Sequence, residues 1–226
     1  PHVREVVCGK NGILEGTKKG QIVVDMSSIA PLASREMGAM LAEKGAEMLD
    51  APVSGGQEKA EKGTLAIMVG GSEASYEKVK DILALMGKST LVGELGAGQT
   101  TKLVNQTIVA INIAAVAEGM AFAKKAGVDP EKVFQAIRGG LAGSQCMEDK
   151  APRMFEGRYN PGFRINLHIK DLTNVLETSR SLHMSMPLAA QLMEMFQNLA
   201  GEGHETLDHG ALGLFYEKLN SLSLKK

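Results

Sequence analysis

A long apolar segment, residues 99–126, divides the chain into two halves of different character. It is apolar on nearly every face of a helix, which is typical of a helix that is buried among other helices. Strand-like runs precede this segment and cease after Gly98, and only helical patterns follow it. We therefore predict an α/β domain over residues 1–97 and an all-helical domain over residues 98–226.

In the first half, short runs of β-branched and apolar residues alternate with helical patterns. The runs predict strands over residues 21–26, 46–53, 64–71 and 89–96. Helices are predicted over residues 2–7, 27–45 and 72–87. Ser27 or Ser28 would cap the second helix and Ser72 the third, and the polar Gly-rich stretch 54–63 predicts a loop. Because a helix joins the first two strands, we expect a right-handed crossover in a parallel sheet.

Apolar residues at helical spacing continue throughout the second half. They predict further helices over residues 130–138, 144–156, 166–183, 187–201 and 208–222. The pair Asp129-Pro130 marks one of the starts, because proline is favoured in the first turn of a helix.

Charge and cysteine usage narrow the class of protein. The formal net charge is −1, there is no Trp, and no run of Lys and Arg occurs, so we expect no nucleic-acid partner. Cys8 and Cys146 form no CxxC motif and no disulfide framework, so we expect reduced thiols in a cytoplasmic protein. The most apolar stretch, 108–123, contains Asn112 and Glu118 and is too short to span a bilayer, so no membrane partner is expected.

A lysine stands in the first turns of the long apolar helix, within the sequence GAGQTTKLVNQ (96–106). Lys102, Asn105 and Gln106 are expected on one helix face, because residues at i, i+3 and i+4 are neighbours. Burial would lower the pKa of the ammonium group and suit this lysine to proton transfer. The alternative is an ordinary surface lysine at a helix start.

Two polar segments follow predicted strands. Successive backbone N–H groups in the turn Ser54-Gly55-Gly56 would form a concave site for an anion, although a plain turn has the same sequence. Ser27 and Ser28 follow the first strand at a carboxyl end, where α/β sheets bind ligands, although helix capping needs only one of them.

The histidines do not indicate a metal site. Neither HxxxH nor HExxH is formed by His2, His168, His183, His204 and His209. We therefore predict no catalytic metal.

Five motifs occur in order along the chain. They are DMSSIAP (25–31), DAPVSGG (50–56), GTLAIMVGG (63–71), GAGQTTKLVNQ (96–106) and FRINLHIKDL (163–172). Together they resemble the β-hydroxyacid dehydrogenases, the family that includes 3-hydroxyisobutyrate and 6-phosphogluconate dehydrogenases. Within this family, the loops DMSSIAPLASRE (25–36) and IRGGLAGS (137–144) most resemble those of the tartronate semialdehyde (2-hydroxy-3-oxopropionate) reductases.

The resemblance implies a reductase that converts tartronate semialdehyde to glycerate with NADH or NADPH. It gives Lys102 the role of general acid and base, and Asn105 the role of binding the substrate or fixing the lysine. It places the substrate carboxylate at Ser54, Gly55 and Gly56, with Gln106 as a weaker substrate contact. It places the cofactor near Ser27, Ser28, Phe163, Lys170 and Asp171. Without the resemblance, the pair Lys170-Asp171 would be interpreted as part of a solvent-exposed helix face, and Phe163 as a residue of the core.

The chain departs from the family at its start, because no GxGxxG occurs anywhere in it. That motif normally cradles the cofactor pyrophosphate. We therefore expect residues 1–97 to be the remainder of a Rossmann-like domain whose N-terminal βαβ units are missing, and expect this chain alone to bind a dinucleotide weakly. The choice between NAD and NADP is left open.

Three functional readings follow. The chain is a tartronate semialdehyde reductase, another 3-hydroxy-acid or small semialdehyde reductase of the same family, or a truncated, non-catalytic oligomerisation module. The apolarity of residues 99–126 exceeds what one small domain covers, so we expect a homodimer or homotetramer formed through residues 98–226, the substrate and dimerisation domain.

Overall fold

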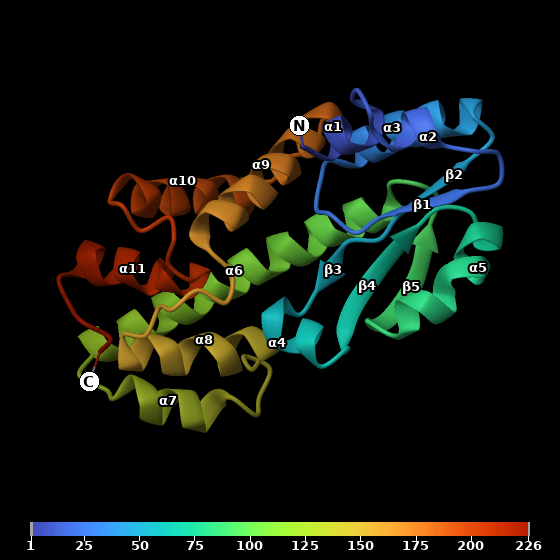
Figure 1. Ribbon diagram of the computed structural model, residues 1–226. Coiled ribbons are helices and arrows are strands. Elements are labelled where there is room, and N and C mark those ends of the chain that lie inside the picture. Colours follow the sequence, from blue (N-terminus) through green and yellow to red (C-terminus); the bar gives the residue numbers. More distant parts are fainter. Residues whose placement is uncertain (1, 226) are drawn as a thin grey trace. The chain divides into compact units, whose positions relative to one another are not determined.

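The computed structural model describes residues 2–225 and divides into two compact units. The first unit ends at Val104 and the second begins at Asn105. Helix α6 (Ala97–Lys125) runs through this division, so the composition shift at Gly98 marks the start of α6 (Figure 1).

A five-stranded sheet forms the centre of the first unit (Figure 1). Its strands are β1 (Ile22–Asp25), β2 (Glu47–Asp50), β3 (Val53–Ser54), β4 (Leu65–Gly70) and β5 (Gly87–Gly93). β1 lies beside β2, while β2 and β3 both pair with β4, and β5 also pairs with β4. The predicted strand 46–53 is therefore two strands, interrupted at Ala51 and Pro52. The missing N–H of Pro52 is one physical reason for the break.

The sheet is mixed rather than wholly parallel. β1 and β2 are parallel, from Ile22 opposite Glu47 to Asp25 opposite Asp50, as the crossover pattern predicts. β4 runs antiparallel to β2 and β3, because the short connection after β3 does not return the chain to the starting edge of the sheet. α5 supplies the longer crossover that makes β4 and β5 parallel.

Among the described residues of the first unit, five helices precede α6. They are α1 (His2–Cys8), α2 (Ile13–Gly16), α3 (Pro31–Glu43), α4 (Gly56–Glu61) and α5 (Glu73–Ala84). The stretch 54–63, predicted to be a loop, contains α4, because its residues after Gly56 are mostly good helix formers.

The caps of these helices were predicted with mixed success. Ser72 caps α5 as predicted, by accepting a hydrogen bond from the Ser75 N–H. The prediction that Ser27 or Ser28 caps α3 is wrong. α3 begins at Pro31, whose fixed φ favours the first helical position, and no side chain bonds its N-terminus.

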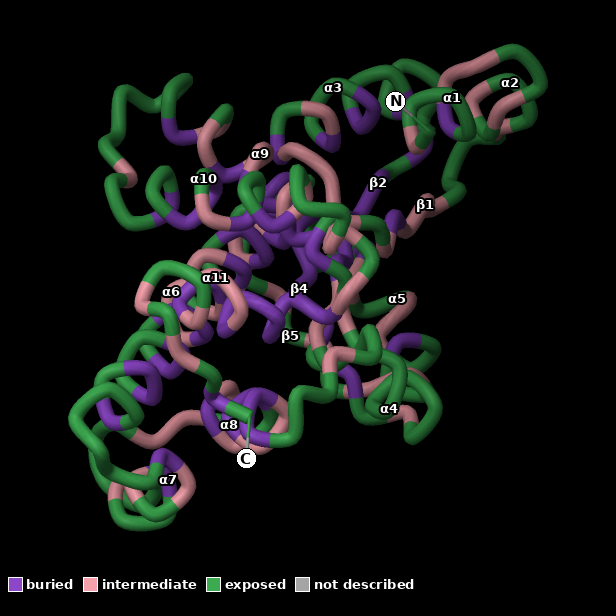
Figure 2. Tube along the Cα trace, turned by 90° about the vertical axis from the view of Figure 1, so that its left-hand side faces the viewer, coloured by how far each residue is buried: buried purple, intermediate pink, exposed green. Residues whose placement is uncertain are grey.

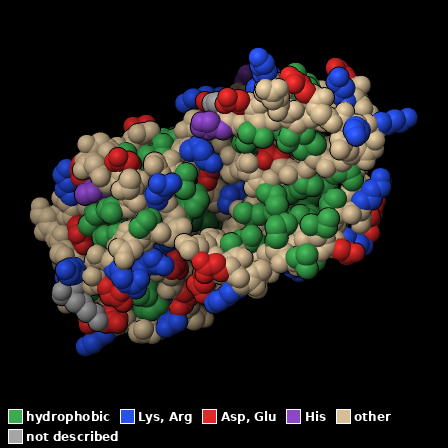
Figure 3. Space-filling model, viewed as in Figure 1, with side chains coloured by type: hydrophobic (Ala, Val, Ile, Leu, Met, Phe, Trp, Pro, Cys, Tyr) green, Lys and Arg blue, Asp and Glu red, His purple; other side chains and the backbone are tan. Residues whose placement is uncertain are grey.

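Each face of the sheet has its own apolar core. On one face Met48 packs with Met37 and Leu41 of α3. On the other, Ile67 packs with Leu83 of α5 and with neighbours on the strands. Figure 2 shows β2 and β4 as mostly buried. β1 is only half-buried along most of its length, and Figure 3 shows apolar side chains gathered over the strands of this unit.

The second unit is wholly helical apart from its connections, as predicted. Besides α6 it contains α7 (Pro130–Ile137), α8 (Gln145–Glu156), α9 (Ile165–Ser181), α10 (Pro187–Gly201), the 3₁₀ helix η1 (His209–Ala211) and α11 (Leu212–Asn220). The predicted helix 208–222 is thus two elements, because Asp208 caps the separate turn η1 through the Gly210 N–H. α9 packs on α10, and Phe196, Leu172 and Met154 lie fully buried in the core (Figure 1).

Of the described helices, α6 alone has the length and apolarity that crossing a membrane would require. Half of its apolar window is buried within the protein, and core helices of soluble proteins meet the same criterion. Ala110, Ile113 and Ala117 are fully buried, whereas Ile108 and Phe122 are exposed.

Candidate active site

The start of α6 is fixed by a buried carboxylate at the end of β2. Asp50 Oδ1 accepts a hydrogen bond from the Gly96 N–H at 2.7 Å, and Oδ2 accepts one from the Gln99 N–H at 2.6 Å. Burial raises the pKa of Asp50, and these two backbone hydrogen bonds oppose that rise. A carboxylate at a helix N-terminus also interacts favourably with the helix dipole. Asp50 therefore stabilises the first turn of α6, the helix that carries Lys102.

Gln99 ties the same turn of α6 to the loop after β1. Its Nε2 donates to the Ser27 carbonyl oxygen at 2.7 Å, and its Oε1 accepts from the Ile29 N–H at 3.0 Å. Gln99 is fully buried. The structure therefore brings the predicted Ser27 segment beside the first turn of α6. Sequence reasoning missed Asp50 and Gln99 as site residues, although both lie inside quoted motifs.

Lys102 lies three residues after Gln99 on α6 and is only 6% exposed. Lys102 is therefore a buried residue and not an ordinary surface lysine. The catalytic role of Lys102 stays a prediction.

Ser27 and Ser28 lie in the loop after β1, where they are exposed and half-buried respectively. The Ser27 N–H donates to Asp25 Oδ1 at 3.0 Å. Asp25 Oδ2 is buried and has no hydrogen-bond partner. The carboxyl end of β1 therefore holds a buried acceptor without a hydrogen-bond partner, followed by the exposed Ser27.

The turn Ser54-Gly55-Gly56 joins β3 to α4. Ser54 pairs with Ala66 of β4, and Gly55 and Gly56 have φ angles of 142° and 68°. Both angles favour glycine, and a Cβ on Gly55 would lie 2.7 Å from the Lys59 Cβ. The φ angles therefore favour glycine at both positions of this turn.

In the second unit, four predicted site residues form one chain of polar contacts. Asn105 Nδ2 donates to Gln106 Oε1 at 2.8 Å, and Gln106 Nε2 donates to Asp171 Oδ2 at 2.5 Å. Asp171 Oδ1 lies 3.0 Å from Lys170 Nζ. Gln106 and Asp171 are buried, while about half of the Lys170 side chain is exposed. Asp171 thus connects the amides of α6 to Lys170 on α9.

Phe163 precedes α9 and packs against two histidines. Its ring centroid lies 5.8 Å from that of His168 and 5.3 Å from that of His209. Phe163 is half-buried, and a cofactor contact of its ring stays a prediction. Sequence reasoning missed the pairing of His168 with His209, because the two lie 41 residues apart.

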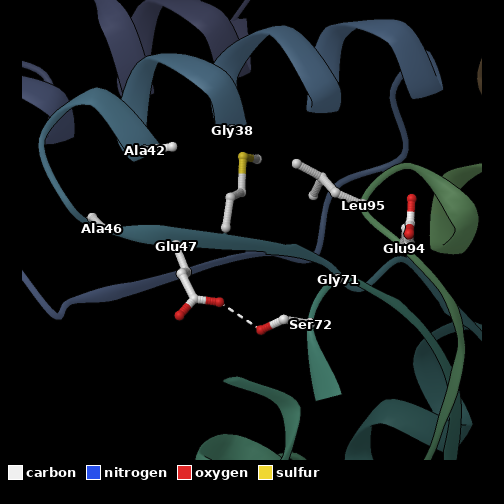
Figure 4. A pocket seen from close by; sticks show the side chains of 9 residues that line it. Gly38, Ala42, Ala46, Glu47, Gly71, Ser72, Glu94 and Leu95 are labelled. Carbon is white, nitrogen blue, oxygen red and sulfur yellow. Dashed lines mark hydrogen bonds between the residues drawn. The ribbon is translucent and has the colours of Figure 1, made fainter. Parts of the chain in front are cut away.

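A separate pocket of about 370 Å³ lies between α3 and the sheet of the first unit (Figure 4). It is lined by Gly38, Ala42, Ala46, Glu47, Met48, Gly71, Ser72, Glu94 and Leu95. The Ser72 hydroxyl donates to Glu47 at 2.5 Å and lowers the pKa of that carboxyl. None of the predicted site residues lines this pocket. Within residues 2–225, no cluster of three or more His, Cys, Asp or Glu side chains is suited to a metal.

Two family descriptions match consecutive parts of the chain. The family described as NAD-binding of NADP-dependent 3-hydroxyisobutyrate dehydrogenase matches residues 96–215. The NAD binding domain of 6-phosphogluconate dehydrogenase matches residues 1–96. Both matches indicate a nicotinamide dinucleotide as cofactor. Because the second begins at residue 1, the expectation that the N-terminal βαβ units are missing is not confirmed.

Individual relatives act on different hydroxy acids. The 2-hydroxy-3-oxopropionate reductase of Escherichia coli (strain K12) is 48% identical over 94% of this chain and 73% of its own length. The 2-(hydroxymethyl)glutarate dehydrogenase of Eubacterium barkeri is 36% identical over 98% of this chain and 74% of its own. The crystal structure of 3-hydroxyisobutyrate dehydrogenase from Salmonella typhimurium has a TM-score of 0.83 at 31% identity, over 94% of this chain and 75% of its own.

Proposed function

Because the chain belongs to the 3-hydroxyisobutyrate dehydrogenase family of NAD(P)-dependent oxidoreductases, we propose that it reduces tartronate semialdehyde (2-hydroxy-3-oxopropionate) to glycerate with NADH or NADPH. The 48% identity to a 2-hydroxy-3-oxopropionate reductase supports this substrate over the others in the family. The alternative within the family is another small semialdehyde or 3-hydroxy acid. We place the protein in the cytoplasm.

The burial of Lys102 is the observation that carries this proposal. A nicotinamide dinucleotide held here would supply the hydride taken up by the aldehyde carbon, and negative charge would then develop on the carbonyl oxygen. Lys102 donates a proton from Nζ to that oxygen, and in the reverse reaction it accepts the proton of the alcohol. A positioned acid of this kind contributes roughly 10²–10⁴-fold to the rate.

The proposed substrate contacts are the turn after β3 and two amides of α6. Backbone N–H groups of Ser54, Gly55 and Gly56 would bind the carboxylate, since a turn with positive φ angles directs successive N–H groups toward an anion. Asn105 would hydrogen-bond the substrate or orient Lys102, and Gln106 would support Asn105 through their 2.8 Å contact.

The residues at the end of β1 fit a dinucleotide. The partnerless oxygen of buried Asp25 is an acceptor that a ligand hydroxyl would satisfy, and Ser28 in the loop after β1 would supply a further polar group. Phe163 and the Lys170–Asp171 pair are further proposed cofactor contacts. A ligand that supplied these hydrogen bonds would remove the free-energy cost of the unsatisfied carboxylate oxygen.

The decisive experiment compares Lys102→Met with the wild type. Methionine keeps an apolar stem but removes the amine, so kcat should fall by roughly 10²–10⁴-fold while the far-UV spectrum stays unchanged. Lys124→Met, at the exposed end of the same helix, is the matched control and should retain full activity. Undiminished turnover in Lys102→Met would reject the mechanism.

A substrate panel tests the assignment within the family. Oxidation of NADH and of NADPH is followed with tartronate semialdehyde, and the reverse reaction with 3-hydroxyisobutyrate and 2-(hydroxymethyl)glutarate. We expect the highest kcat/KM with tartronate semialdehyde. A higher value for either hydroxy acid would transfer the assignment to that substrate.

An exposed apolar stripe on α6 supports self-association and a second candidate function. Val104, Ile108 and Phe122 are 54%, 54% and 76% exposed, and their spacing places them on one side of the helix. We propose that this stripe forms a homodimer or homotetramer. A non-catalytic oligomerisation module would need only the stripe. Titration calorimetry separates the candidates, because an oligomer that binds neither NADH nor NADPH would favour the module.

A further inference from the structure

Two buried histidines of the second unit contact each other directly, and the proposed mechanism uses neither. His168 of α9 and His209 of η1 are 0% and 6% exposed. Their Nδ1 atoms are 2.8 Å apart. The other ring nitrogen of His168, Nε2, lies 3.2 Å from the backbone carbonyl oxygen of Gln106 on α6. Both ring nitrogens of His168 are therefore engaged.

These contacts determine where the protons reside. A carbonyl oxygen only accepts, so His168 must carry its proton on Nε2 and donate it to Gln106. A neutral His168 then has a lone pair on Nδ1, and this lone pair must accept a hydrogen bond from the Nδ1–H of His209. A proton on both Nδ1 atoms would place two donors face to face. One neutral arrangement satisfies both hydrogen bonds, with His168 protonated on Nε2 and His209 on Nδ1.

The surroundings of the pair favour this neutral arrangement. The ring of His168 stacks on Phe196 at 5.1 Å, and Phe163 packs against both imidazoles. Burial lowers the pKa of His209 well below its usual range, and His168, Lys150 and Arg153 lower it further. Asp208 opposes them, but its charge is already balanced by Lys150 Nζ at 2.9 Å.

We propose that His168 and His209 are positioning residues that hold α6 against α9. His209 fixes the tautomer of His168, and His168 fixes the carbonyl of Gln106 in the turn of α6 that presents Asn105 and Gln106. Gln106 is held a second time by Asp171, which lies three residues after His168 on α9. This inference rests on the proposed function only in assigning Asn105 and Gln106 to the site.

The two hydrogen bonds of His168 can be removed one at a time. In His168→Gln the amide Nε2 replaces the ring Nε2 and still donates to Gln106. In His168→Asn the shorter amide reaches only the position of Nδ1, so the bond to Gln106 is lost. We expect kcat within about threefold of wild type for His168→Gln and a fall of roughly tenfold or more for His168→Asn, because small misplacements of site groups are costly.

A second pair of variants tests the role of His209. His209→Asn keeps a donor at the position of Nδ1, whereas His209→Leu leaves His168 Nδ1 unpaired. His209→Asn should therefore retain near-wild-type kcat, and His209→Leu should lose roughly tenfold. Far-UV circular dichroism and thermal unfolding show whether each variant is folded. In the His168→Gln background, His209→Leu should cost little extra activity, because the tautomer no longer matters.

Nitrogen-15 NMR of the histidine rings measures the tautomers without any turnover. At pH 7 we expect His168 to carry its proton on Nε2 and His209 on Nδ1, both neutral, and we expect His209→Leu to change the spectrum of His168. The opposite tautomers, or a charged ring at pH 7, would overturn the proposal. So would equal kcat values for folded His168→Asn and His168→Gln.

These outcomes separate the inference from the proposed function. If no substrate of the panel is turned over, the proposed function fails, and the NMR spectra still decide the tautomers. If Lys102→Met abolishes turnover while the paired histidine variants do not differ, only the positioning role fails.

Discussion

At the scale of single residues, the side chains that fix the start of α6 matter as much as the proposed catalytic amine. Lys102 is useful only if its helix begins at a defined place. Asp50 fixes that place by accepting two backbone hydrogen bonds, and Gln99 links it to the loop that carries Ser27. A polar side chain buried in this way is costly unless every group is paired, and Gln99 has a partner for both its donor and its acceptor.

Gln99→Ala should therefore destabilise the protein. It leaves the Ile29 N–H and the Ser27 carbonyl oxygen without the partner they have now, and we expect a loss of about 1–3 kcal/mol in the free energy of unfolding. Gln57→Ala is the control, because the Gln57–Glu61 hydrogen bond is exposed and should contribute less than about 0.5 kcal/mol. Urea unfolding measures both. Equal losses in the free energy of unfolding for the two variants would show that the buried hydrogen bonds of Gln99 stabilise the protein no more than an exposed one.

At the scale of elements, α6 combines two demands on one helix. Its fully buried side, with Ala110, Ile113 and Ala117, belongs to the core of the second unit. Its opposite side carries the exposed stripe of Val104, Ile108 and Phe122. The sequence predicts a helix apolar on nearly all faces, and only the structure separates the covered side from the uncovered one.

Ile108→Asp and Phe122→Asp should weaken self-association, because a charge in a buried apolar interface is costly. We expect light scattering to show an oligomer for the wild type and a smaller species for the double variant. Leu219→Asp places the same charge on α11, where the leucine is 67% exposed, and is the matched control. A wild type that is monomeric at all concentrations would contradict the proposed oligomer.

Helical spacing and caps in the sequence predict most of the helices and strands. They do not predict the contacts between residues that are distant in the sequence. Ser72 and Asp129-Pro130 mark helix starts because their effect is local. α4 was missed because its N-cap and first residue are the glycines Gly55 and Gly56, which are poor helix formers. The antiparallel direction of β4 follows from the length of a connection rather than from any alternation of residues. The pairs Asp50 with Gln99 and His168 with His209 lie 49 and 41 residues apart, so no local pattern indicates them.

At the scale of the whole molecule, the buried histidine links stability to pH. The pKa of His209 is lowered well below 6.5 in the folded state, so near that pH the unfolded chain binds more protons than the folded one. The contribution of His209 to the free energy of unfolding is therefore fully present above pH 6.5. It is lost as the pH decreases below 6.5, by at most about 1.4 kcal/mol per pH unit for one proton.

A second group contributes only at lower pH. Burial alone would raise the pKa of Asp208, but the charges of His209 and Lys150 lower it from 3.8 to about 2. This lowered pKa stabilises the folded state above pH 3.8, and the contribution is lost as the pH falls toward 2. Each of the two groups shifts the pKa of the other, so their titrations are linked.

We expect the free energy of unfolding, measured in urea, to fall between pH 7 and about pH 5 in the wild type. In His209→Asn this decline should be largely absent, because asparagine does not titrate. His183→Asn is the control, since His183 is exposed, its φ of 53° is one that asparagine tolerates, and it should keep the wild-type slope. The same decline in His209→Asn as in wild type would assign the pH dependence to other groups and leave His209 without a role in it.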